Sequence, residues 1–511
     1  MEQSSRTINS VKNIIMVYIS QVISLLLQFL SRTVFIYTLG VNYLGFNALF
    51  SDILKLLSLA DLGFSSVMAY TFYKPLAEND NDKLASLISF YQKVYRIIAL
   101  SVATLGLCII PFLDIIVNTE KKVPNLVFYY LLYLTNSVMS YLFVYKTTLL
   151  VADQKNYILV KLRTKINFVV TIIQMVLLLL TSNFILYLLL MNISTFLQNI
   201  IPSRQVEKLY PKINNGRPLS KQELRSILSN LKSVFIYKIS SILINSTDNI
   251  LISILVGTSW VGYYSNYLLI ISSVTMFVTG IFTSMTATVG NLLVTEKPEK
   301  RLQVFNSEQV LAFIVAGIVV PCFCLLANDF IHVWLGKDFV LDKLVVYAIT
   351  INFYLTCIFQ PLWSFREASG LYRKTRYVMT VTAVINLVLS IILGKSIGLP
   401  GILIATAISK ISTYFWYEPN ILFKDYFQKS SKFFYKEVFK NVVFVVFIIF
   451  FVGKITDYIS VDTWFNWLTK AVVCGMLSLM LSILFYRKSE GFDFIVSKMK
   501  SILHKSSSSR S

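Results

Sequence analysis

Long apolar runs separated by short polar segments make up most of the chain. A run of roughly 18 or more apolar residues predicts a helix that can cross the ~30 Å hydrocarbon core of a bilayer. The polar segments between such runs predict loops at the two membrane surfaces. Fourteen spans are predicted in this way, at 13–38, 44–73, 97–117, 125–145, 166–181, 183–201, 233–256, 262–293, 310–327, 344–363, 377–394, 400–417, 441–459 and 464–486.

The amino-acid composition agrees with this pattern. Of the 511 residues, 56% are hydrophobic and 14% are charged, whereas soluble domains carry about 25% charged residues. The first apolar run is too long for a secretory signal peptide, contains Arg32 and lacks a small-residue cleavage site, so we expect it to remain as the first span. The predicted fold class is therefore an all-α polytopic membrane protein.

The distribution of the basic residues along the chain indicates on which side of the membrane each loop lies. The chain has 47 Lys and Arg against 26 Asp and Glu, a net charge of +21. A nucleic-acid partner is not expected, because it would require a basic patch on a folded soluble domain. With a cytoplasmic N-terminus, 37 basic residues lie in cytoplasmic segments and 6 in outer segments, when Lys238 and Lys454 are counted with the loops they adjoin. Basic residues accumulate in cytoplasmic loops, so both termini are predicted to be cytoplasmic.

An internal repeat relates the two halves of the chain. The segment LGVNYLG returns as VGTSWVG, and three glycines recur at a displacement of 217 residues. They are Gly40, Gly45 and Gly63, which return as Gly257, Gly262 and Gly280. Six spans separate the copies, so both copies cross the membrane in the same direction. This predicts two six-helix bundles related by a parallel pseudo-two-fold axis along the membrane normal, with the last two spans as an addition outside them.

The repeat divides the chain into five parts. They are a first bundle at 1–201, a basic cytoplasmic linker at 202–232, a second bundle at 233–424, two additional spans at 425–486 and a basic cytoplasmic tail at 487–511. In the linker, Ser220 followed by Glu223 predicts a capping box that starts a short amphipathic helix. The basic residues of the linker are expected near the anionic headgroups of membrane lipids. A second amphipathic helix, at 79–96, is expected to lie on the membrane before the third span.

Polar residues follow one face of each of the first two spans. A spacing of three or four residues places side chains on one side of a helix. The face of the first span includes Gln28 and Arg32, and that of the second includes Lys55 and Asp61. An ionisable side chain in hydrocarbon is costly, so two such faces on adjacent spans predict a water-filled pathway. The alternative is that these residues bond between helices and only hold them together.

Three more polar residues are candidates for the same pathway. Asn245 and Asp248 lie in the seventh span, and Lys410 lies in the middle of the twelfth. The repeat makes the first and seventh spans equivalent, so we expect these faces to line one central cavity. The candidate substrate-binding residues are Gln28, Arg32, Lys55, Asp61, Asn245, Asp248 and Lys410. Three of them are basic and two are acidic, so the ligand should be anionic, and phosphate suits both Arg and Lys.

The sequence offers little for catalysis or metal binding. The five cysteines lie in or near apolar runs, and the only histidines are His332 and His504. Neither a disulfide framework nor a metal site is predicted from these positions. The sequence contains no Walker A phosphate loop and no nucleophile elbow. We therefore expect no metal, no cofactor and no enzymatic activity.

Three short motifs near the N-terminus are specific. They are Leu44-Gly45, LADLGF at Leu59 to Phe64, and Tyr73-Lys74-Pro75. With these motifs the chain resembles bacterial polysaccharide repeat-unit flippases of the Wzx type, in the multidrug/oligosaccharidyl-lipid/polysaccharide exporter superfamily. The length, the fourteen spans and the repeat extend the resemblance over most of the chain.

The resemblance implies a function that the residues alone do not reach. It implies alternating access and a substrate made of an oligosaccharide repeat unit on undecaprenyl pyrophosphate. This lipid-linked oligosaccharide would cross the bacterial cytoplasmic membrane for capsule or a related surface glycan. A polysaccharide polymerase and other assembly proteins are the implied protein partners.

Two other functions stay open. A cation-coupled multidrug antiporter of the same architecture would bind an organic cation with acidic groups such as Asp61 and Asp248, and Arg32 argues against it. A membrane polymerase or ligase needs catalytic groups on a sizeable outer loop, and the longest outer segment, about 328–343, is short. From the residues alone, the chain is a transporter for an amphiphilic or anionic solute.

The charge distribution can be tested through the linker at 202–232. Since this linker is predicted to be cytoplasmic, a Ser220→Cys variant in intact cells should react with a membrane-impermeant thiol reagent no more than the parent chain does. Permeabilised cells should show additional labelling of the variant. Additional labelling in intact cells would contradict both the repeat alignment and the number of spans.

Overall fold

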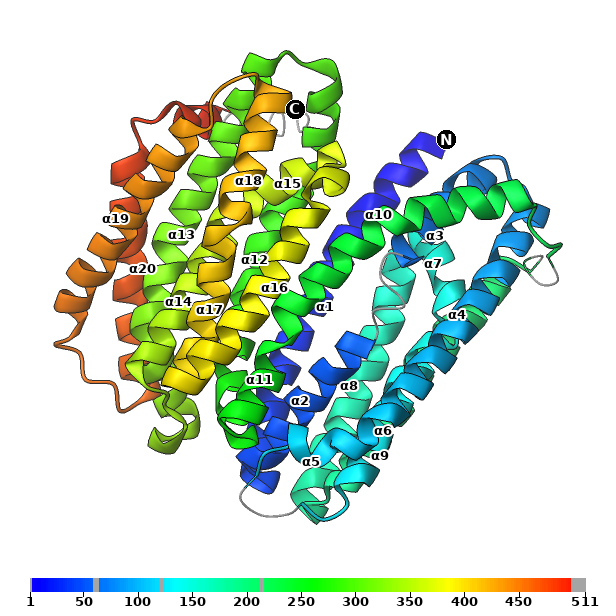
Figure 1. The fold of residues 1–511 in the computed structure, drawn as a ribbon, viewed down its shortest axis with the longest axis horizontal. Coiled ribbons are helices and arrows are strands. Elements are labelled where there is room, and N and C mark those ends of the chain that lie inside the picture. The colour runs from blue at the N-terminus through cyan, green and yellow to red at the C-terminus, as the bar shows by residue number, and fades with distance from the viewer. Residues whose placement is uncertain (1, 58–63, 120–122, 212, 214–215, 498–511) are drawn as a thin grey trace, which may run out of the picture. The chain divides into compact units, whose positions relative to one another are not determined.

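The fold is built from helices throughout the part of the chain that is described. The computed structural model describes residues 2–57, 64–119, 123–211, 213 and 216–497, and every regular element in these ranges is helical (Figure 1). By their internal contacts the helices form two compact units, Met1–Gly262 and Tyr263–Ser511. The domain division predicted above follows the repeat rather than contacts, and it stays a prediction.

The first unit contains eleven α-helices among its described residues, and the start of a twelfth. They are α1 (Glu2–Leu39), α2 (Val41–Leu57), α3 (Phe64–Ala77), α4 (Asn81–Ile109), α5 (Leu113–Ile116), α6 (Leu126–Tyr141), α7 (Val144–Ala152), α8 (Asn156–Thr181), α9 (Phe184–Leu209), α10 (Lys221–Ser246), α11 (Asp248–Leu255) and the start of α12 (Thr258–Thr295). In this unit α8 packs between α1 and α9, α6 packs on α4 and α9, and both α10 and α11 contact α2.

The second unit contains the rest of α12 and the helices that follow. They are α13 (Pro298–Leu335), α14 (Lys343–Ile358), α15 (Gln360–Ser369), α16 (Tyr372–Ile397), α17 (Leu399–Ser412), α18 (Tyr414–Leu422), a π-helical turn (Phe423–Phe427), α19 (Lys432–Thr456) and α20 (Trp464–Tyr486). In this unit α17 packs between α14 and α16, and α13 contacts α14, α19 and α20.

Fewer helices than the fourteen predicted are each long and apolar enough to cross a membrane alone. Among the described residues, nine helices are long and apolar enough to cross a membrane, and the bent pairs α6 with α7 and α14 with α15 raise this to eleven. The other predicted spans, 44–73, 233–256 and 400–417, coincide with α2 and α3, α10 and α11, and α17 and α18, which do not meet the criterion. The polytopic helical class is confirmed, and the count of fourteen stays a prediction.

One of the breaks has a clear chemical cause. Helices α14 and α15 meet at an angle of 43°, and Pro361 lies in the first turn of α15. Proline has no backbone N–H to donate and fixes φ, so it suits the start of a helix and not its interior. A pattern of apolar residues does not register such a break, because both pieces are apolar.

Helix α4 corrects the expectation of a separate surface helix at 79–96. It begins after Asp80, whose carboxylate accepts from the Lys83 backbone N–H at 2.9 Å, and runs without a break for 29 residues. Its apolar face, which includes Tyr91 and Tyr95, is buried inside the first unit rather than laid on the bilayer. A face of aromatic residues suits a lipid interface and a protein interior equally well, so the sequence pattern could not separate the two.

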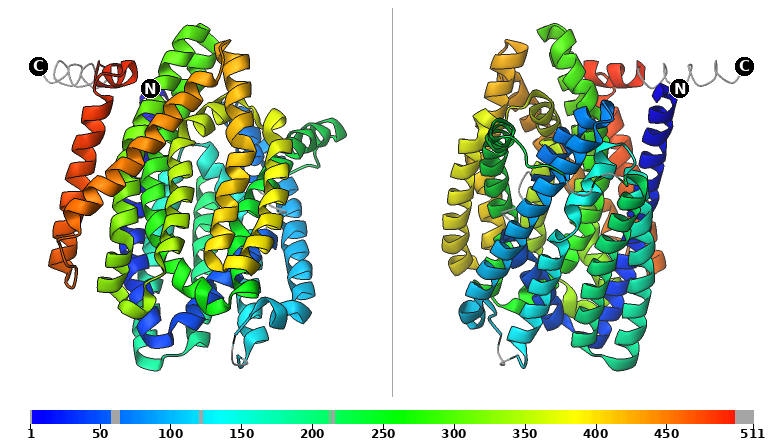
Figure 2. Two further views of the ribbon diagram at one scale, coloured as in Figure 1. Left: turned by 60° about the vertical axis from the view of Figure 1, so that its left-hand side comes forward. Right: turned by 90° about the vertical axis from the view of Figure 1, so that its right-hand side faces the viewer.

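The two additional helices α19 and α20 dock on α13 through polar as well as apolar contacts (Figures 1 and 2). Asn441 on α19 is fully buried and donates to the Tyr486 hydroxyl on α20 at 2.9 Å. Its side-chain oxygen accepts from Tyr354 on α14 at 2.8 Å. Lys470 on α20 pairs with Asp329 on α13 at 2.7 Å. These contacts fix the two helices against the second unit.

The outward face of α19 is apolar. Val443 and Phe447 are exposed there, as side chains that contact lipid would be. Their predicted position away from a transport pathway stays a prediction.

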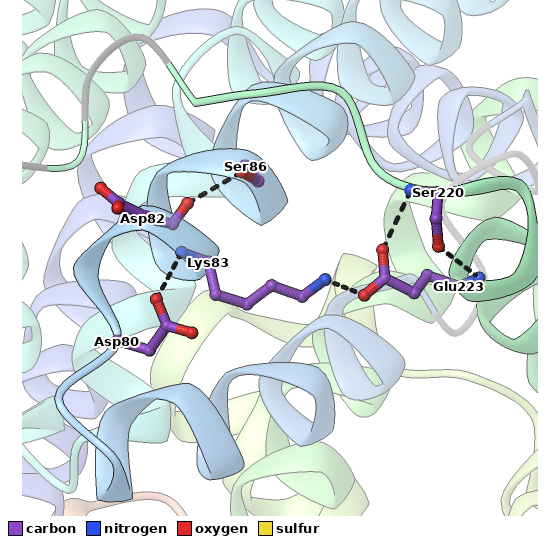
Figure 3. Close-up of polar contacts among 6 residues, drawn as sticks. All are labelled: Asp80, Asp82, Lys83, Ser86, Ser220 and Glu223. Atoms are coloured by element: carbon purple, nitrogen blue, oxygen red, sulfur yellow. Dashed lines mark hydrogen bonds and ion pairs between the residues drawn. The ribbon is translucent and has the colours of Figure 1, made fainter.

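The linker between α9 and α10 is fastened to the N-terminal end of α4 (Figure 3). The Ser220 side chain accepts from the Glu223 backbone N–H at 3.3 Å, and the Glu223 carboxylate accepts from the Ser220 N–H at 3.0 Å. Glu223 also bonds Lys83 of α4. The linker backbone at Gly216 packs directly on the backbone of α4, since a Cβ built on Gly216 would lie 2.1 Å from the Ala85 backbone. The capping box is confirmed, but the helix it starts runs for 26 residues and is not short.

The Lys83–Glu223 pair should hold the linker on α4. Its hydrogen bond from Lys83, with those from Ser220, lowers the pKa of Glu223 to about 2, so the attachment is complete at neutral pH and is lost as the pH falls toward 2. In the purified Glu223→Gln variant at neutral pH, trypsin should cleave the linker roughly two- to five-fold faster. Glu299→Gln, at an exposed position in the first turn of α13, is the matched control. Equal cleavage of the Glu223→Gln variant and the parent would show that other contacts hold the linker.

Candidate functional site

Arg32 is a half-buried cation inside a membrane helix of the first unit. Helix α1 is unbroken for 38 residues, which places Arg32 about 12 Å along the axis from the turn at Gly40. Its guanidinium lies within electrostatic range of the Tyr187 hydroxyl on α9. The Tyr187 ring also meets Phe35 of α1 edge to face, with the ring centres 5.1 Å apart.

A second tyrosine extends this polar group. Tyr133 on α6 is buried and its hydroxyl donates to the Asn47 side-chain oxygen on α2 at 2.6 Å. Gln174 on α8 donates to the Tyr187 carbonyl oxygen at 3.1 Å and so ties α8 to α9. The interior of the first unit therefore brings a guanidinium and phenolic hydroxyls together, and both kinds of group can donate hydrogen bonds to an anion.

Lys55 is held by a buried carboxylate that the sequence analysis left out of the site. Its Nζ lies 2.7 Å from Asp52, three residues earlier on α2. Asp52 is buried, and its other oxygen accepts from the Asn249 amide on α11 at 2.6 Å. The Lys55 side chain itself is 64% exposed. Because Asp52 balances its charge, Lys55 adds less positive potential to the site than its charge alone suggests.

Arg32 and Lys55 lie at different depths. Counted from the turn at Gly40, Arg32 is about 12 Å along α1 and Lys55 about 22 Å along α2. The two cations are therefore separate positions and do not form one cluster.

For three other candidate binding residues the structure gives the helix and the exposure of the side chain. Gln28 is exposed on α1, one turn before Arg32. Asp248 is half-buried in the first turn of α11, in the first unit. Lys410 is half-buried in the last turn of α17, in the second unit.

Two candidates cannot be placed. Asp61 lies outside the described residues, and so does the side chain of Asn245. The backbone nevertheless corrects one expectation, because the helix is interrupted at Thr247 between α10 and α11. Asn245 and Asp248 therefore do not share the face of one continuous helix.

The second unit contains buried ionisable residues that the sequence analysis missed. Arg366 on α15 and Glu418 on α18 form a buried pair at 2.7 Å. Glu308 on α13 is buried, and neither of its carboxylate oxygens has a hydrogen-bond partner among the described residues. Residues 366 and 418 are far apart in sequence and Glu308 lies beside an apolar run, so no spacing signal could have found them. Removing one member of a buried pair leaves an uncompensated charge, and we assign the Arg366–Glu418 pair to stability.

The described residues contain no group of three or more His, Cys, Asp or Glu side chains placed to hold a metal ion. All five cysteines are free thiols.

Comparison with known proteins gives matches in structure only. No protein-family model matches the chain, and no curated protein matches its sequence. The lipid II flippase MurJ, in an inward closed conformation, superposes with a TM-score of 0.65 at 16% identity, over 93% of this chain and 98% of MurJ. A multidrug resistance MATE family transporter of the MOP superfamily, in an inward-facing conformation, gives 0.61 at 15% identity, over 77% of this chain and 93% of the other. A MOP superfamily transporter from Pyrococcus furiosus, described as having a binding pocket of reverse polarity, gives 0.55 at 15% identity, over 82% and 96%.

These matches cover nearly the whole length of each transporter at low sequence identity, so they report the fold. The same architecture appears among them in inward-facing and outward-facing conformations. The proteins named above are transporters, and at this identity the likeness shows their fold alone. The chain is a multi-pass membrane protein with the fold of the MOP superfamily transporters.

Proposed function

We propose that this protein is a flippase that moves undecaprenyl-pyrophosphate-linked oligosaccharide repeat units across the bacterial cytoplasmic membrane. It would work by alternating access and supply capsule or another surface polysaccharide. The proposal includes fourteen crossings with both termini in the cytoplasm. A polysaccharide polymerase and other assembly proteins would take up the translocated units.

The observation that carries the proposal is the position of Arg32. A half-buried guanidinium in a membrane helix, within electrostatic range of the Tyr187 hydroxyl, suits an anionic group that carries hydroxyls. A pyrophosphate linked to a sugar has both properties. Arg offers a planar bidentate fork to phosphate oxygens.

Lys55 suits an earlier contact with the same substrate. It lies farther than Arg32 from the turn at Gly40, which the predicted topology places on the outer side, so Lys55 is nearer the cytoplasm. Its side chain is exposed and anchored by Asp52. We propose that the pyrophosphate meets Lys55 on entry and Arg32 deeper in the pathway, with Gln28, Asp61, Asn245, Asp248 and Lys410 as further contacts.

A cation-coupled multidrug antiporter is the second candidate, and the MATE family shares the fold. Such a protein needs an acidic group available to an organic cation. In the first unit the buried carboxylate of Asp52 is already bonded by Lys55 and Asn249. This pairing argues against Asp52 as the site of an organic cation. Buried Glu308 of the second unit, with both carboxylate oxygens unbonded among the described residues, is the acidic group that the antiporter would use.

Arg32→Ala should reduce surface glycan by about tenfold or more while the protein inserts at a normal level. The reason is the loss of a charge-assisted contact, which contributes roughly 1.5–3 kcal/mol. Arg32→Lys should keep part of the activity, because phosphate accepts a point charge. Surface glycan and membrane abundance should be measured together for each variant.

A matched control separates substrate binding from stability. Arg366→Ala removes a different arginine, one that neutralises buried Glu418, and should lower membrane abundance. Normal glycan in the Arg32→Ala variant would rule out substrate binding at Arg32. Low abundance of that variant would show that Arg32 holds helices together instead.

Lys55→Ala should have a smaller effect on glycan output for each inserted molecule, on the order of two- to five-fold, because the Lys55 side chain is exposed to screening by water. Since the variant also removes the cation from buried Asp52, its membrane abundance should be measured together with glycan output. The double variant Arg32→Ala/Lys55→Ala should combine both losses. A tenfold loss from Lys55→Ala alone would show that Lys55, and not Arg32, is the principal phosphate contact.

A further inference from the structure

The connection between α18 and α19 in the second unit carries a concentration of positive charge (Figure 1). Residues 424–440 contain five lysines and two acidic residues, a net charge of +3. All five lysine side chains are exposed to the surroundings of the protein. They are Lys424, Lys429, Lys432, Lys436 and Lys440. Such a stretch attracts anions unless acidic side chains of the same protein neutralise it.

The two acidic residues of this stretch are both occupied. Asp425 pairs with Lys374 of α16 at 2.6 Å, and Glu437 pairs with Lys440 one turn later on α19 at 2.6 Å. The other four lysines of the stretch make no ion pair with the described residues. We call these four residues, Lys424, Lys429, Lys432 and Lys436, the basic turn. Their charges are available to an anion from outside the chain.

The basic turn lies on a firmly packed support. Phe423 and Phe427 of the π-helical turn and Phe434 of α19 are buried beneath it. The Phe305 ring of α13 meets all three, with ring centres 5.5 Å from Phe423, 5.3 Å from Phe427 and 6.2 Å from Phe434. The backbone that carries the lysines is thus held in place before any ligand binds, which lowers the cost of ordering it on binding.

Aromatic side chains beside the basic turn place it at the boundary of the membrane. Trp416 of α18 is 48% exposed and Phe433 of α19 is 52% exposed. Tyr435 lies next to Trp416, with the ring centres 4.6 Å apart, and its hydroxyl donates to the Trp416 carbonyl oxygen at 2.8 Å. Trp and Tyr are enriched where hydrocarbon meets the headgroups. Helix α19, which is long and apolar enough to cross a membrane, begins here at Lys432.

We propose that the basic turn binds the headgroups of anionic phospholipids. A lipid supplies the two properties that this surface calls for, since its phosphate meets the lysines and its acyl chains meet the exposed aromatic rings. A soluble acidic protein or a free phosphate ion would satisfy the lysines alone. The attraction of each lysine to an anionic membrane surface is modest, but several lysines together give a selective site. This interaction is separate from transport and does not depend on which solute is carried.

The test counts the lipids that the purified full-length protein retains in detergent, by native mass spectrometry during titration with phosphatidylglycerol or phosphatidylcholine. Lys432→Gln/Lys436→Gln should weaken phosphatidylglycerol binding by about tenfold or more. Phosphatidylcholine, which has the same phosphate without net charge, should bind weakly and equally to the parent and the variant. Undiminished phosphatidylglycerol binding by the variant would overturn the proposal.

A matched double variant controls for the loss of two positive charges. Lys337→Gln/Lys343→Gln removes two other exposed lysines of the second unit, between α13 and α14, and should leave phosphatidylglycerol binding unchanged. Both double variants change only exposed side chains, so elution as a single folded species is expected for each. An equal loss of binding in the two variants would show that net charge, and not the basic turn, attracts the lipid.

A third variant separates a lipid from a soluble anion. Phe433→Ala should weaken phosphatidylglycerol binding several-fold, because acyl chains lose an apolar contact. Phe465→Ala, at another exposed aromatic residue, on α20, is its control and should have no effect. Inorganic phosphate at millimolar concentration should not displace phosphatidylglycerol from the parent. Displacement by phosphate, or full binding by the Phe433→Ala variant, would show that the basic turn recognises charge alone and is not a lipid site.

Discussion

A charged side chain in a membrane helix has to find its polar partners inside the protein, because lipid supplies none. In the first unit this constraint selects which helices can be neighbours. Asp52 is stable in the interior because Lys55 and Asn249 both bond its carboxylate, and these bonds join α2 to α11. One turn after Arg32, Phe35 of α1 meets the Tyr187 ring of α9 edge to face and so relates these two helices. The polar contacts thus assemble the bundle as well as its candidate binding site.

The same requirement operates in the second unit. Arg366 and Glu418 neutralise each other, and Asn441 is enclosed by tyrosine hydroxyls. The Arg366–Glu418 pair joins α15 to α18, and the bonds of Asn441 join α19 to α14 and α20. Polar contacts therefore fix helices to one another in the second unit as well.

Close packing at glycines also joins helices, at the turns that come before α2 and α12. Gly45 and Gly262 let backbone meet backbone where any side chain would overlap a carbonyl oxygen. The internal repeat places the two glycines at equivalent positions, so a single local design serves both sides of the contact. A duplicated sequence can therefore build a symmetric contact without an additional element.

The sequence by itself determined the class of the protein, because length and apolarity are sufficient to identify membrane helices. It also determined the capping box at Ser220, because this motif needs only two residues that are three positions apart. It indicated Arg32 as a candidate binding residue, because a cation lies there within an apolar run. Helix breaks such as that at Thr247 and the burial of the α4 face depend on contacts between distant segments, and only the tertiary structure decided them. The partner of Lys55 was three residues away and could have been predicted, but Asn249 and Tyr187 could not, since they lie on other helices. Local spacing fixes which side of a helix a residue occupies, and the packing of the bundle decides what that side meets.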